Sequence, residues 1–280
     1  MAEITAAAVK ALRERTGLPM MECKKALTES RGDETAAIAV LNRKYKGKME
    51  ERAGRETGEG RIGVYISPDR RIGGIVELRC ETAPVAKNAV FVDLVTRMAK
   101  AVAVQEKKEP SPETILTAKA GDGKTVNDAV VEAYAKLQET MNLIRCRKVA
   151  GGSLTQYVHH DGKSGVLLAF DTAPSPETVA VDLAQHAMFT KPLAITREGL
   201  SAEVLEQVKE TARAVALDEG KPANIIEKIV QGKVNAFCAE HALMEQEHVK
   251  PDYDKKRVRE VLKAAGVSAV EDLAIMVVGG

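Results

Sequence analysis

The chain has 280 residues, of which 45% are hydrophobic and 29% charged, a balance typical of a folded protein with a soluble surface. This length suits about two domains of ordinary size. The formal net charge of +1 gives no general attraction to nucleic acid or to an anionic membrane. Aromatic residues make up only 3% of the chain and Trp is absent, which argues against a base-stacking surface.

The four cysteines, at positions 23, 80, 146 and 238, lie far apart, without a CxxC pair. Isolated cysteines in apolar runs are typical of buried side chains in a reducing compartment. No segment approaches the roughly 20 apolar residues that span a bilayer, and the N-terminal stretch lacks the apolar core of a signal peptide. These features predict a cytoplasmic protein without a metal, a cofactor or membrane contact.

Residues 1–54 are predicted to form a small three-helix domain and a linker. Thr5 and Asp33 suit the caps of the first and third helices, and Pro19 suits the start of the second. The charged segment KYKGKMEERAGRETGEG is either a linker or the solvated end of the third helix. Apolar residues recur at helical spacing at Val9, Leu12, Met20, Met21, Cys23, Leu27, Ala37, Ile38 and Leu41.

Beyond this segment the chain repeats a pattern. GRIGVYISPDRRIGGIVELRCETAPVAKNAVFVDL can be aligned with GSLTQYVHHDGKSGVLLAFDTAPSPETVAVDL. Each copy has two short strands, a polar turn, a Thr-Ala-Pro corner and a helix that contains Val-Asp-Leu. The repeat predicts an α+β fold with two core subdomains, residues 55–150 and 151–280, each an antiparallel sheet covered by helices. NLIRCRKVA and LAIMVV are expected to add one strand to each sheet.

At the first corner, IVELRCETAPVAKNAVF predicts a strand that runs into a helix. The alternating run 75–80 places Glu77 and Arg79 opposite an apolar face. Pro84 suits the first turn of the helix and pushes Ala83 towards an extended conformation. The corner is either a simple connection or the functional tip of the subdomain. The helix is expected to bury a stripe formed by Val85, Ala89, Val92, Ala99 and Val102.

A helical hairpin is predicted over residues 200–241. Ser201 suits the cap of its first helix, and Gly220-Lys221-Pro222 turns the chain into the second. The narrow apolar seams favour a coiled coil that projects from the body, and packing flat on a sheet is the alternative. The seam residues are expected to be Leu205, Val208, Ala212 and Val215, followed by Ile226, Val230 and Phe237.

Little in the sequence indicates catalysis. The segment AGDGKTV (120–126) lacks the first Gly of a phosphate-binding loop, because Ala118 stands there, and a short helix rather than a strand precedes it. We interpret it as a polar turn. His159 and His160 lie at a strand end without further ligands nearby, and they too suggest a turn. No nucleophile is paired with a base in the sequence, which favours a binding protein over an enzyme.

Four segments carry a family resemblance: LRERTGLPMMECKKAL (12–27), GDETAAIAVL (32–41), YVHHDGKSGVLL (157–168) and DLAQHAMFTKP (182–192). In this order, together with the GKP-turned hairpin, they closely resemble bacterial translation elongation factor Ts over nearly the whole chain. The resemblance implies a ubiquitin-associated-like three-helix domain, a two-subdomain core with a coiled-coil insertion, and a C-terminal module. It also implies that the chain binds elongation factor Tu carrying GDP and promotes exchange of GDP for GTP without covalent chemistry.

The resemblance further implies partner contacts at named residues. Arg13, Met20 and Met21 match positions of the three-helix domain that meet the partner's GTPase domain, and His186 matches a His that faces the partner. The structural alternatives are that at least one of the two adjacent Met residues is buried in the core and that His186 only packs inside the protein.

The first corner departs from the family pattern of Thr-Asp-Phe-Val, which forms a tip that enters the partner near its magnesium site. Here the tip reads Thr82, Ala83, Pro84 and Val85, so that a carboxylate and a large aromatic ring are lost. Because Mg²⁺ requires strict octahedral geometry, a small shift of the partner's helices would still loosen the nucleotide. We expect Pro84 to act as a smaller, stiffer wedge. A second departure is Glu247-His248, where Pro-Phe is usual.

These departures motivate an alternative function. A divergent paralogue would bind elongation factor Tu without efficient nucleotide exchange, and an assay of GDP release distinguishes the two. A third hypothesis, a nucleotide-binding enzyme acting through residues 121–125, predicts that the isolated protein binds ATP or GTP, which we do not expect.

Overall fold

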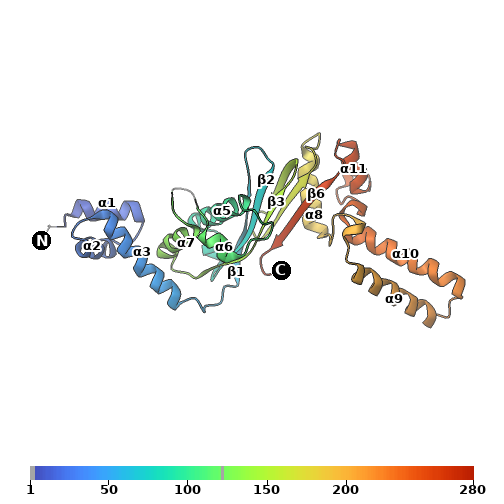
Figure 1. Cartoon of the computed structure of the whole chain (residues 1–280), viewed down its shortest axis with the longest axis horizontal. Coiled ribbons are helices and arrows are strands. Elements are labelled where there is room, and N and C mark those ends of the chain that lie inside the picture. The colour runs from blue at the N-terminus through green and yellow to red at the C-terminus, as the bar shows by residue number, and fades with distance from the viewer. Residues whose placement is uncertain (1–3, 121–122) are drawn as a thin grey trace.

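The computed structural model describes residues 4–120 and 123–280 of the chain. Figure 1 shows an elongated molecule with a helical domain at its N-terminal end, two sheets in the middle and a helical hairpin at the far end. Mixed helices and antiparallel sheets confirm the predicted α+β class. The domain boundaries near residues 54 and 150 stay predictions.

Three helices form the N-terminal domain: α1 (Ala6–Thr16), α2 (Met20–Glu29) and α3 (Glu34–Glu51). Thr5 accepts a hydrogen bond from the backbone N–H of Ala8, and Asp33 accepts one from Ala36, so both predicted caps are confirmed. Helix α3 continues through the first half of the charged segment. That half is therefore a solvated helix end, and only the following residues connect the helix to the core.

The first sheet contains β1 (Glu59–Ile66), β2 (Ile72–Cys80) and β3 (Met141–Ala150), which pair antiparallel in the order β1-β2-β3. Helices α5 (Ala89–Ala103), α6 (Pro112–Thr117) and α7 (Val126–Leu137) lie on its outer side (Figure 1). Two glycines allow α5 to approach closely. A Cβ atom on Gly63 would lie 2.0 Å from the side chain of Val95, and one on Gly74 would lie 2.1 Å from the carbonyl oxygen of Ala99.

The second sheet contains β4 (Ser153–Val158), β5 (Ser164–Phe170) and β6 (Val270–Val277), in the order β4-β5-β6. Helices α8 (Thr178–Thr190) and α11 (Val258–Ala264) pack on its outer face through a shared apolar cluster. Three short 3₁₀ helices, Arg197–Gly199, Leu243–Glu245 and Pro251–Tyr253, lie in its connections. The predicted repeat and both added strands are confirmed.

The two sheets pack face to face, which the sequence did not indicate. A separate apolar cluster fills the space between them: Ile62, Ile75, Val149, Leu154, Leu167, Ala169, Ala274 and Met276. Consequently β2 is buried on both faces, under α5 on one side and under the second sheet on the other. Glu77 and Arg79 do lie opposite the apolar face, as expected, but their face is covered by protein and is not a solvated one.

Glu77 is fully buried and links both subdomains. Its carboxylate accepts hydrogen bonds from Nε of Arg79 (2.8 Å), Nε of Arg145 (2.7 Å) and the backbone N–H of Gly279 (3.0 Å). Burial alone would raise the pKa of Glu77, but these three donors lower it below its ordinary value. Arg145 also donates to the carbonyl oxygen of Val277 (2.6 Å), so the network ties β3 to the end of β6.

The hairpin consists of α9 (Ala202–Asp218) and α10 (Ala223–His241), and it projects from the body in Figure 1. Projection is therefore confirmed over flat packing. The buried seam residues near its tip are Ala212, Ala216, Ile226 and Val230. The prediction that Val215 belongs to the seam is wrong, because a four-residue step from Ala212 leads to Ala216 and leaves Val215 51% exposed.

The Glu77 network predicts a strong effect on stability. Glu77→Ala would leave two arginines without their carboxylate. We expect a loss of about 3 kcal/mol in the free energy of unfolding, at the lower end of the cost of breaking a buried pair, because both arginines are partly exposed. Urea unfolding measures it. The control Asp93→Ala removes an exposed carboxylate that pairs with Arg97, and it should cost less than about 0.5 kcal/mol. Equal losses of unfolding free energy in the two variants would contradict the proposal that the buried network contributes more to stability than an exposed ion pair.

Candidate functional site

The corner after β2 is a short, stiff turn. The strand ends at Cys80, and helix α4 (Ala83–Ala86) follows, with Thr82 extended at its N-cap. Pro84 lies in the first turn of α4, as predicted from its missing N–H. The expectation that Ala83 is extended is wrong. Ala83 is already helical, and the extended residue is Thr82, one position earlier.

The helix predicted to run on from the corner is interrupted. The chain leaves helical geometry after α4, and Asn88 caps the new helix α5 by accepting a hydrogen bond from the N–H of Val90 (2.9 Å). The predicted buried stripe is therefore wrong at Ala89, which is exposed, and Val85 and Val92 are only half-buried, whereas Ala99 and Val102 are buried as expected. The buried face of α5 consists of Phe91, Leu94, Val95, Met98, Ala99, Ala101, Val102 and Ala103.

The corner presents two side chains to solvent from a fixed base. Thr82 and Pro84 are exposed, whereas Ala83 and Val85 are half-buried. Ala86, at the end of α4, is buried in the same apolar cluster as β2 and α5. This arrangement fits a small protruding tip.

The loop between α7 and β3 holds the corner. The carboxylate of Glu139 accepts hydrogen bonds from the backbone N–H (3.0 Å) and the hydroxyl (2.6 Å) of Thr82. In return, the carboxylate of Glu81 accepts a hydrogen bond from the N–H of Thr140 (2.8 Å). We call these four residues the clasp. The Thr140 N–H, helped by Arg55, lowers the pKa of Glu81 below its ordinary value.

The clasp was not predicted from the sequence, although the two strand ends carry a signal for it. Cys80 of β2 pairs with Met141 of β3, and continuing this register places Glu81 opposite Thr140 and Thr82 opposite Glu139. The two Glu-Thr dipeptides are therefore matched across neighbouring strand ends. Finding them requires the strand register, which the sequence alone does not supply.

The second Thr-Ala-Pro corner differs from the first. Pro174 is buried, and no helix starts there, because α8 begins only at Thr178. The N–H of Ser175 donates to the carbonyl oxygen of Ala265 (3.0 Å), which draws the corner onto the connection before β6. Only the first corner presents its proline to solvent.

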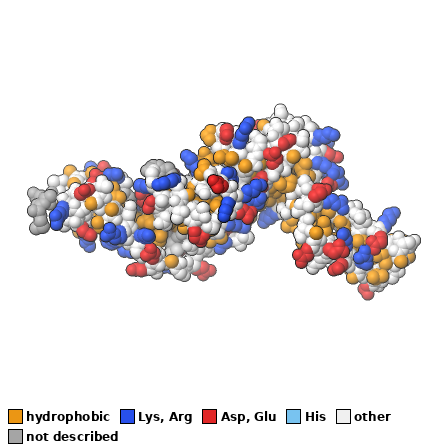
Figure 2. All heavy atoms as spheres, in the orientation of Figure 1, with side chains coloured by type: hydrophobic (Ala, Val, Ile, Leu, Met, Phe, Trp, Pro, Cys, Tyr) orange, Lys and Arg blue, Asp and Glu red, His pale blue; other side chains and the backbone are white. Residues whose placement is uncertain are grey.

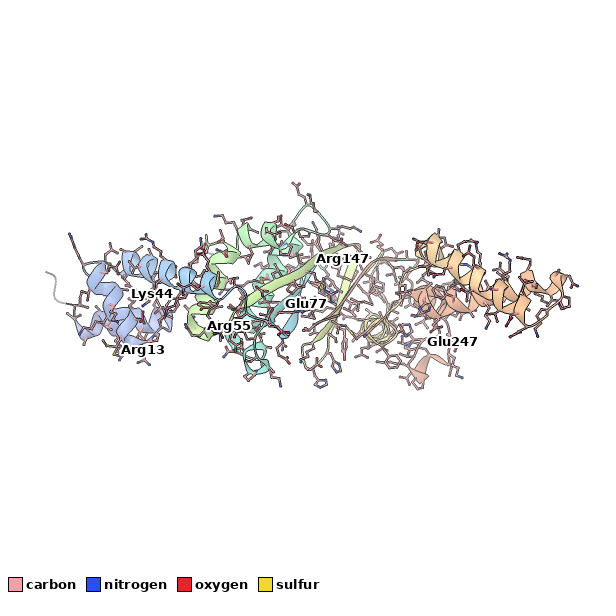
Figure 3. All side chains as sticks on the ribbon, turned by 90° about the horizontal axis from the view of Figure 1, so that it is seen from below. Arg13, Lys44, Arg55, Glu77, Arg147 and Glu247 are labelled. Carbon is pink, nitrogen blue, oxygen red and sulfur yellow. The ribbon has the colours of Figure 1, made fainter. Side chains whose placement is uncertain are left out.

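The candidate contacts of the three-helix domain lie on its surface. Arg13 is exposed, and Figure 3 shows it on this domain. Met20 and Met21 are 47% and 62% exposed. The alternative that one of them belongs to the core is therefore wrong, because Cys23, Ala26 and Leu27 form the inward face of α2.

His186 lies inside the second subdomain and is fully buried. Its Nε2 is 2.9 Å from Oε1 of Gln246, and its Nδ1 accepts a hydrogen bond from the N–H of Val249 (3.2 Å). Burial lowers its pKa. This is the geometry of the packing alternative, and contact of His186 with a partner stays a prediction.

His248 stacks on His186 with ring centroids 4.9 Å apart, and it also contacts the ring of Tyr253. Burial, together with the neighbouring His186, lowers the pKa of His248 to about 4. Asp182 binds both Tyr253 and Lys250 beside this pair. The histidine therefore fills an interior packing position in the C-terminal module, whereas Glu247 next to it is exposed.

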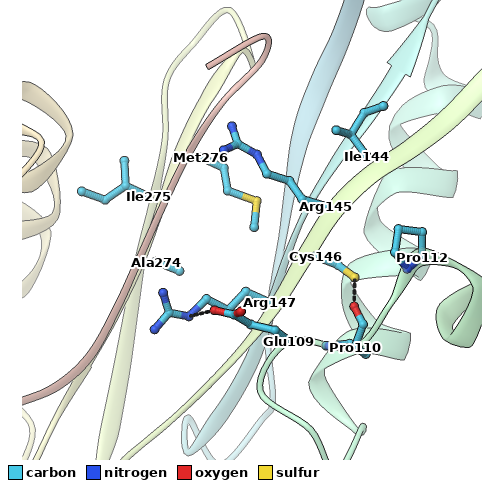
Figure 4. Close-up of a pocket in the computed structure, with 10 residues that line it drawn as sticks. All are labelled: Glu109, Pro110, Pro112, Ile144, Arg145, Cys146, Arg147, Ala274, Ile275 and Met276. Atoms are coloured by element: carbon cyan, nitrogen blue, oxygen red, sulfur yellow. Dashed lines mark hydrogen bonds and ion pairs between the residues drawn. The ribbon is translucent and has the colours of Figure 1, made fainter. Parts of the chain in front are cut away.

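A groove of about 390 Å³ lies between β3 and β6, and Figure 4 shows the residues that line it. Its two arginines are already paired, Arg145 with Glu77 and Arg147 with Asp272 (2.9 Å). The thiol of Cys146 donates to the carbonyl oxygen of Pro110 (3.1 Å). The groove is thus a largely apolar seam between the subdomains, and both of its arginines are already paired with carboxylates.

The remaining candidates for chemistry are structural. Burial raises the pKa of the Cys80 thiol to about 12 and that of Cys146 to about 11, so both are protonated at neutral pH. All four cysteines are buried and free, as predicted. Within residues 4–120 and 123–280, no three His, Cys, Asp or Glu side chains gather as a metal site.

Turns were predicted at His159-His160 and in the segment 120–126, and only the first lies entirely within the described residues. His159 and His160 follow the end of β4 in a turn, as expected, with Nδ1 of His159 3.0 Å from the hydroxyl of Tyr157. In the segment 120–126, residues 121 and 122 lie outside the described residues, and Lys119 forms a β-bridge with Thr125.

Among the described residues, no helix has the length and apolar character needed to cross a membrane.

Comparison with known proteins identifies the family. The family model described as Elongation factor TS matches residues 81–280, which include the corner and the whole second subdomain. The chain belongs to the elongation factor Ts family. The resemblance inferred from the sequence is thereby confirmed, and the chain is a translation elongation factor of this family.

Full-length relatives agree with this assignment. Elongation factor Ts of Bordetella avium is 40% identical over 280 residues, which cover 100% of this chain and 92% of the relative. Elongation factor Ts of an Azoarcus species is 41% identical over the same shares. That of Clostridium botulinum is 40% identical over 255 residues, 88% of this chain and 82% of the relative. Similarity to the elongation factor Ts family therefore extends into the three-helix domain, outside the range of the family model.

The buried His248 predicts a pH-dependent stability. Its pKa is 6.5 in the unfolded chain and about 4 in the folded protein, so between these values the unfolded state binds more protons. The free energy of unfolding therefore falls as the pH drops from about 6.5 to about 4. His248→Phe should remove about 2 kcal/mol of this loss near pH 5, measured by urea unfolding across pH.

His186, whose pKa burial also lowers, should retain part of the pH dependence in that variant. The control His160→Gln changes an exposed turn residue and should leave the dependence as it is in the unaltered protein. An unchanged slope in His248→Phe would show that His248 titrates normally.

Proposed function

We propose that this chain binds elongation factor Tu carrying GDP and promotes the exchange of GDP for GTP, through shape and contact alone and without covalent chemistry. Family membership supports the partner, and the exposed corner Thr82–Val85 on its fixed base is the observation that carries the mechanism. A stiff tip can shift the partner's helices next to the nucleotide. Because Mg²⁺ holds phosphate and protein oxygens in strict octahedral geometry, a small shift weakens the binding of GDP.

The coupling between the two ligands of the partner is reciprocal. If contact with this chain weakens GDP binding by a given factor, GDP weakens the binding of this chain by the same factor. GTP entry then releases the exchange factor in the same way. The chain needs no bound cofactor for this cycle, because the nucleotide and the metal ion are both bound by the partner.

One further surface and one buried residue contribute to binding in this proposal. Arg13, Met20 and Met21 form an exposed anchor on the three-helix domain, since an arginine beside flexible apolar side chains suits an interface. His186 contributes indirectly, by holding residues 246–249 against α8 through its two hydrogen bonds.

A divergent paralogue that binds elongation factor Tu without efficient exchange is the second candidate. The observation in its favour is the corner itself, which offers an alanine at position 83 and a proline at position 84 in place of a carboxylate and an aromatic ring. Release of fluorescent GDP from elongation factor Tu, with and without this chain, distinguishes the candidates. Faster release supports exchange, and binding without faster release supports the paralogue.

Pro84 provides the sharpest test of the corner. We expect Pro84→Gly to lower the rate of GDP release at saturating concentrations of this chain, because glycine removes the wedge and frees the backbone. Stopped-flow fluorescence measures the rate. Pro68→Gly is the matched control, since Pro68 is also exposed but lies in the turn before β2, at the opposite end of that strand from the corner. Equal rates for the unaltered chain and Pro84→Gly would dispose of the wedge.

The exposed methionines should affect affinity instead. We expect the double variant Met20→Ala/Met21→Ala to raise the concentration for half-maximal stimulation about fivefold or more, with the maximal rate retained. Its thermal stability should not change, because both side chains are largely exposed. Val104→Ala, which truncates a side chain that is 65% exposed at the end of α5, is the control. The same shift in both variants would contradict a specific contact.

A further inference from the structure

Glu139 lies behind the corner and not at its tip, yet it contacts the exposed Thr82 twice. We propose that Glu139 is a positioning residue for nucleotide exchange: the clasp fixes the corner and, through Arg52, joins it to the three-helix domain as one rigid unit. This inference rests on the proposed function and names residues that act within it.

The conformation of Thr82 depends on Glu139. An N-cap threonine usually turns its side-chain oxygen to accept a hydrogen bond from the start of its own helix. Thr82 makes no such bond to α4, and its hydroxyl donates to Glu139 instead. Its N–H also donates to Glu139, and its carbonyl oxygen accepts a hydrogen bond from the thiol of Cys80 (3.3 Å). Glu139 therefore sets the direction in which the corner leaves the sheet.

The linker is attached to the loop that holds the corner. Arg52 directly follows α3, and its guanidinium donates to the carbonyl oxygen of Gln138 (2.7 Å) and contacts Glu81 (3.5 Å). Its own carbonyl oxygen accepts a hydrogen bond from the hydroxyl of Thr140 (3.0 Å). Arg55 adds an ion pair to Glu81 (3.1 Å), and Figure 3 shows this residue at the junction of the two domains.

The connection between the three-helix domain and this loop is continuous. Helix α3 runs without a break from the three-helix domain to Glu51, next to Arg52. The hydroxyl of Tyr134, on α7, donates to the carbonyl oxygen of Lys48 near the end of α3 (3.2 Å). The end of α3 and the corner are therefore held by the same loop, residues 138–140. A partner that contacts both the Met20–Met21 surface and the corner meets a single body.

This arrangement has a kinetic consequence. Contact at the three-helix domain can orient the corner against the partner only if the two do not move independently. Loss of the clasp should therefore lower the rate of GDP release in the complex more than it lowers affinity, because the anchor on the three-helix domain remains.

The test compares Glu139→Gln with Glu132→Gln, a control on α7 whose carboxylate pairs with Lys124 and does not contact the corner. Amide hydrogen exchange of Thr82 in the isolated protein reports the clasp. Fluorescent GDP release from elongation factor Tu, across concentrations of this chain, reports its consequence. In Glu139→Gln we expect the Thr82 amide to exchange about tenfold faster, since a charge-assisted acceptor is lost.

In the same variant we expect the saturating release rate to fall about fivefold or more, which is the size of effect that the loss of one charged hydrogen bond can produce. The half-saturating concentration should change less than about twofold. Arg52→Gln tests the coupling separately. It should also lower the saturating rate, while the Thr82 amide stays protected, because Arg52 does not contact Thr82.

Each contrary outcome has its own meaning. An unchanged Thr82 amide in Glu139→Gln would overturn the clasp, and a faster amide with an unchanged release rate would overturn the positioning role. An unchanged release rate in Arg52→Gln would overturn the rigid coupling to the three-helix domain. If the unaltered chain does not accelerate GDP release at all, the proposed function fails and the role of Glu139 in exchange fails with it, while the amide measurement still decides the clasp.

Discussion

The burial of β2 on both faces is the constraint from which the position of the candidate site follows. On one face, Gly74 lets α5 approach until backbone meets backbone, and on the other face Ile75 packs against the second sheet. A strand held in this way has little freedom at its end. The corner directly follows that end, and Ala86 at its far side is buried in the same apolar cluster, so the base of the corner is fixed in the core.

Polar groups between the two sheets specify how the sheets are aligned. An apolar interface alone would tolerate sliding, since area burial has no direction. Glu77 and Asp272 come from different sheets, and both bind arginines of β3, Arg145 and Arg147. Such pairs add little net stability after the cost of desolvation, but they penalise any other register, because a shift would leave a buried charge unpaired. The alignment in turn places the end of β6 beside β3.

The sequence predicted local structure well and the contacts between distant segments poorly. Caps such as Thr5 and Asp33, the strand-turn-strand repeat and the hairpin follow from neighbouring residues, and all were confirmed. The burial of Glu77 could not be predicted in this way, because its alternation with apolar residues equally fits a strand face exposed to solvent. Its partner Arg145 is distant in sequence, and only the fold brings them together. The break at Asn88 was predictable from its capping preference, but the spacing of apolar residues concealed it.

The repeat itself shows why the first corner, and not the second, has the features of a functional tip. Both corners begin with an acidic residue that accepts a backbone N–H from the connection before the neighbouring strand: Glu81 from Thr140, and Asp171 from Ser268. The two corners differ in the residue that lies opposite their threonine. Continuing the strand register, Glu139 faces Thr82 in the first subdomain, whereas Ser268 takes the corresponding place in the second. The same Thr-Ala-Pro triplet thus exposes its proline where a carboxylate holds its threonine, and it buries the proline where a serine takes the place of that carboxylate.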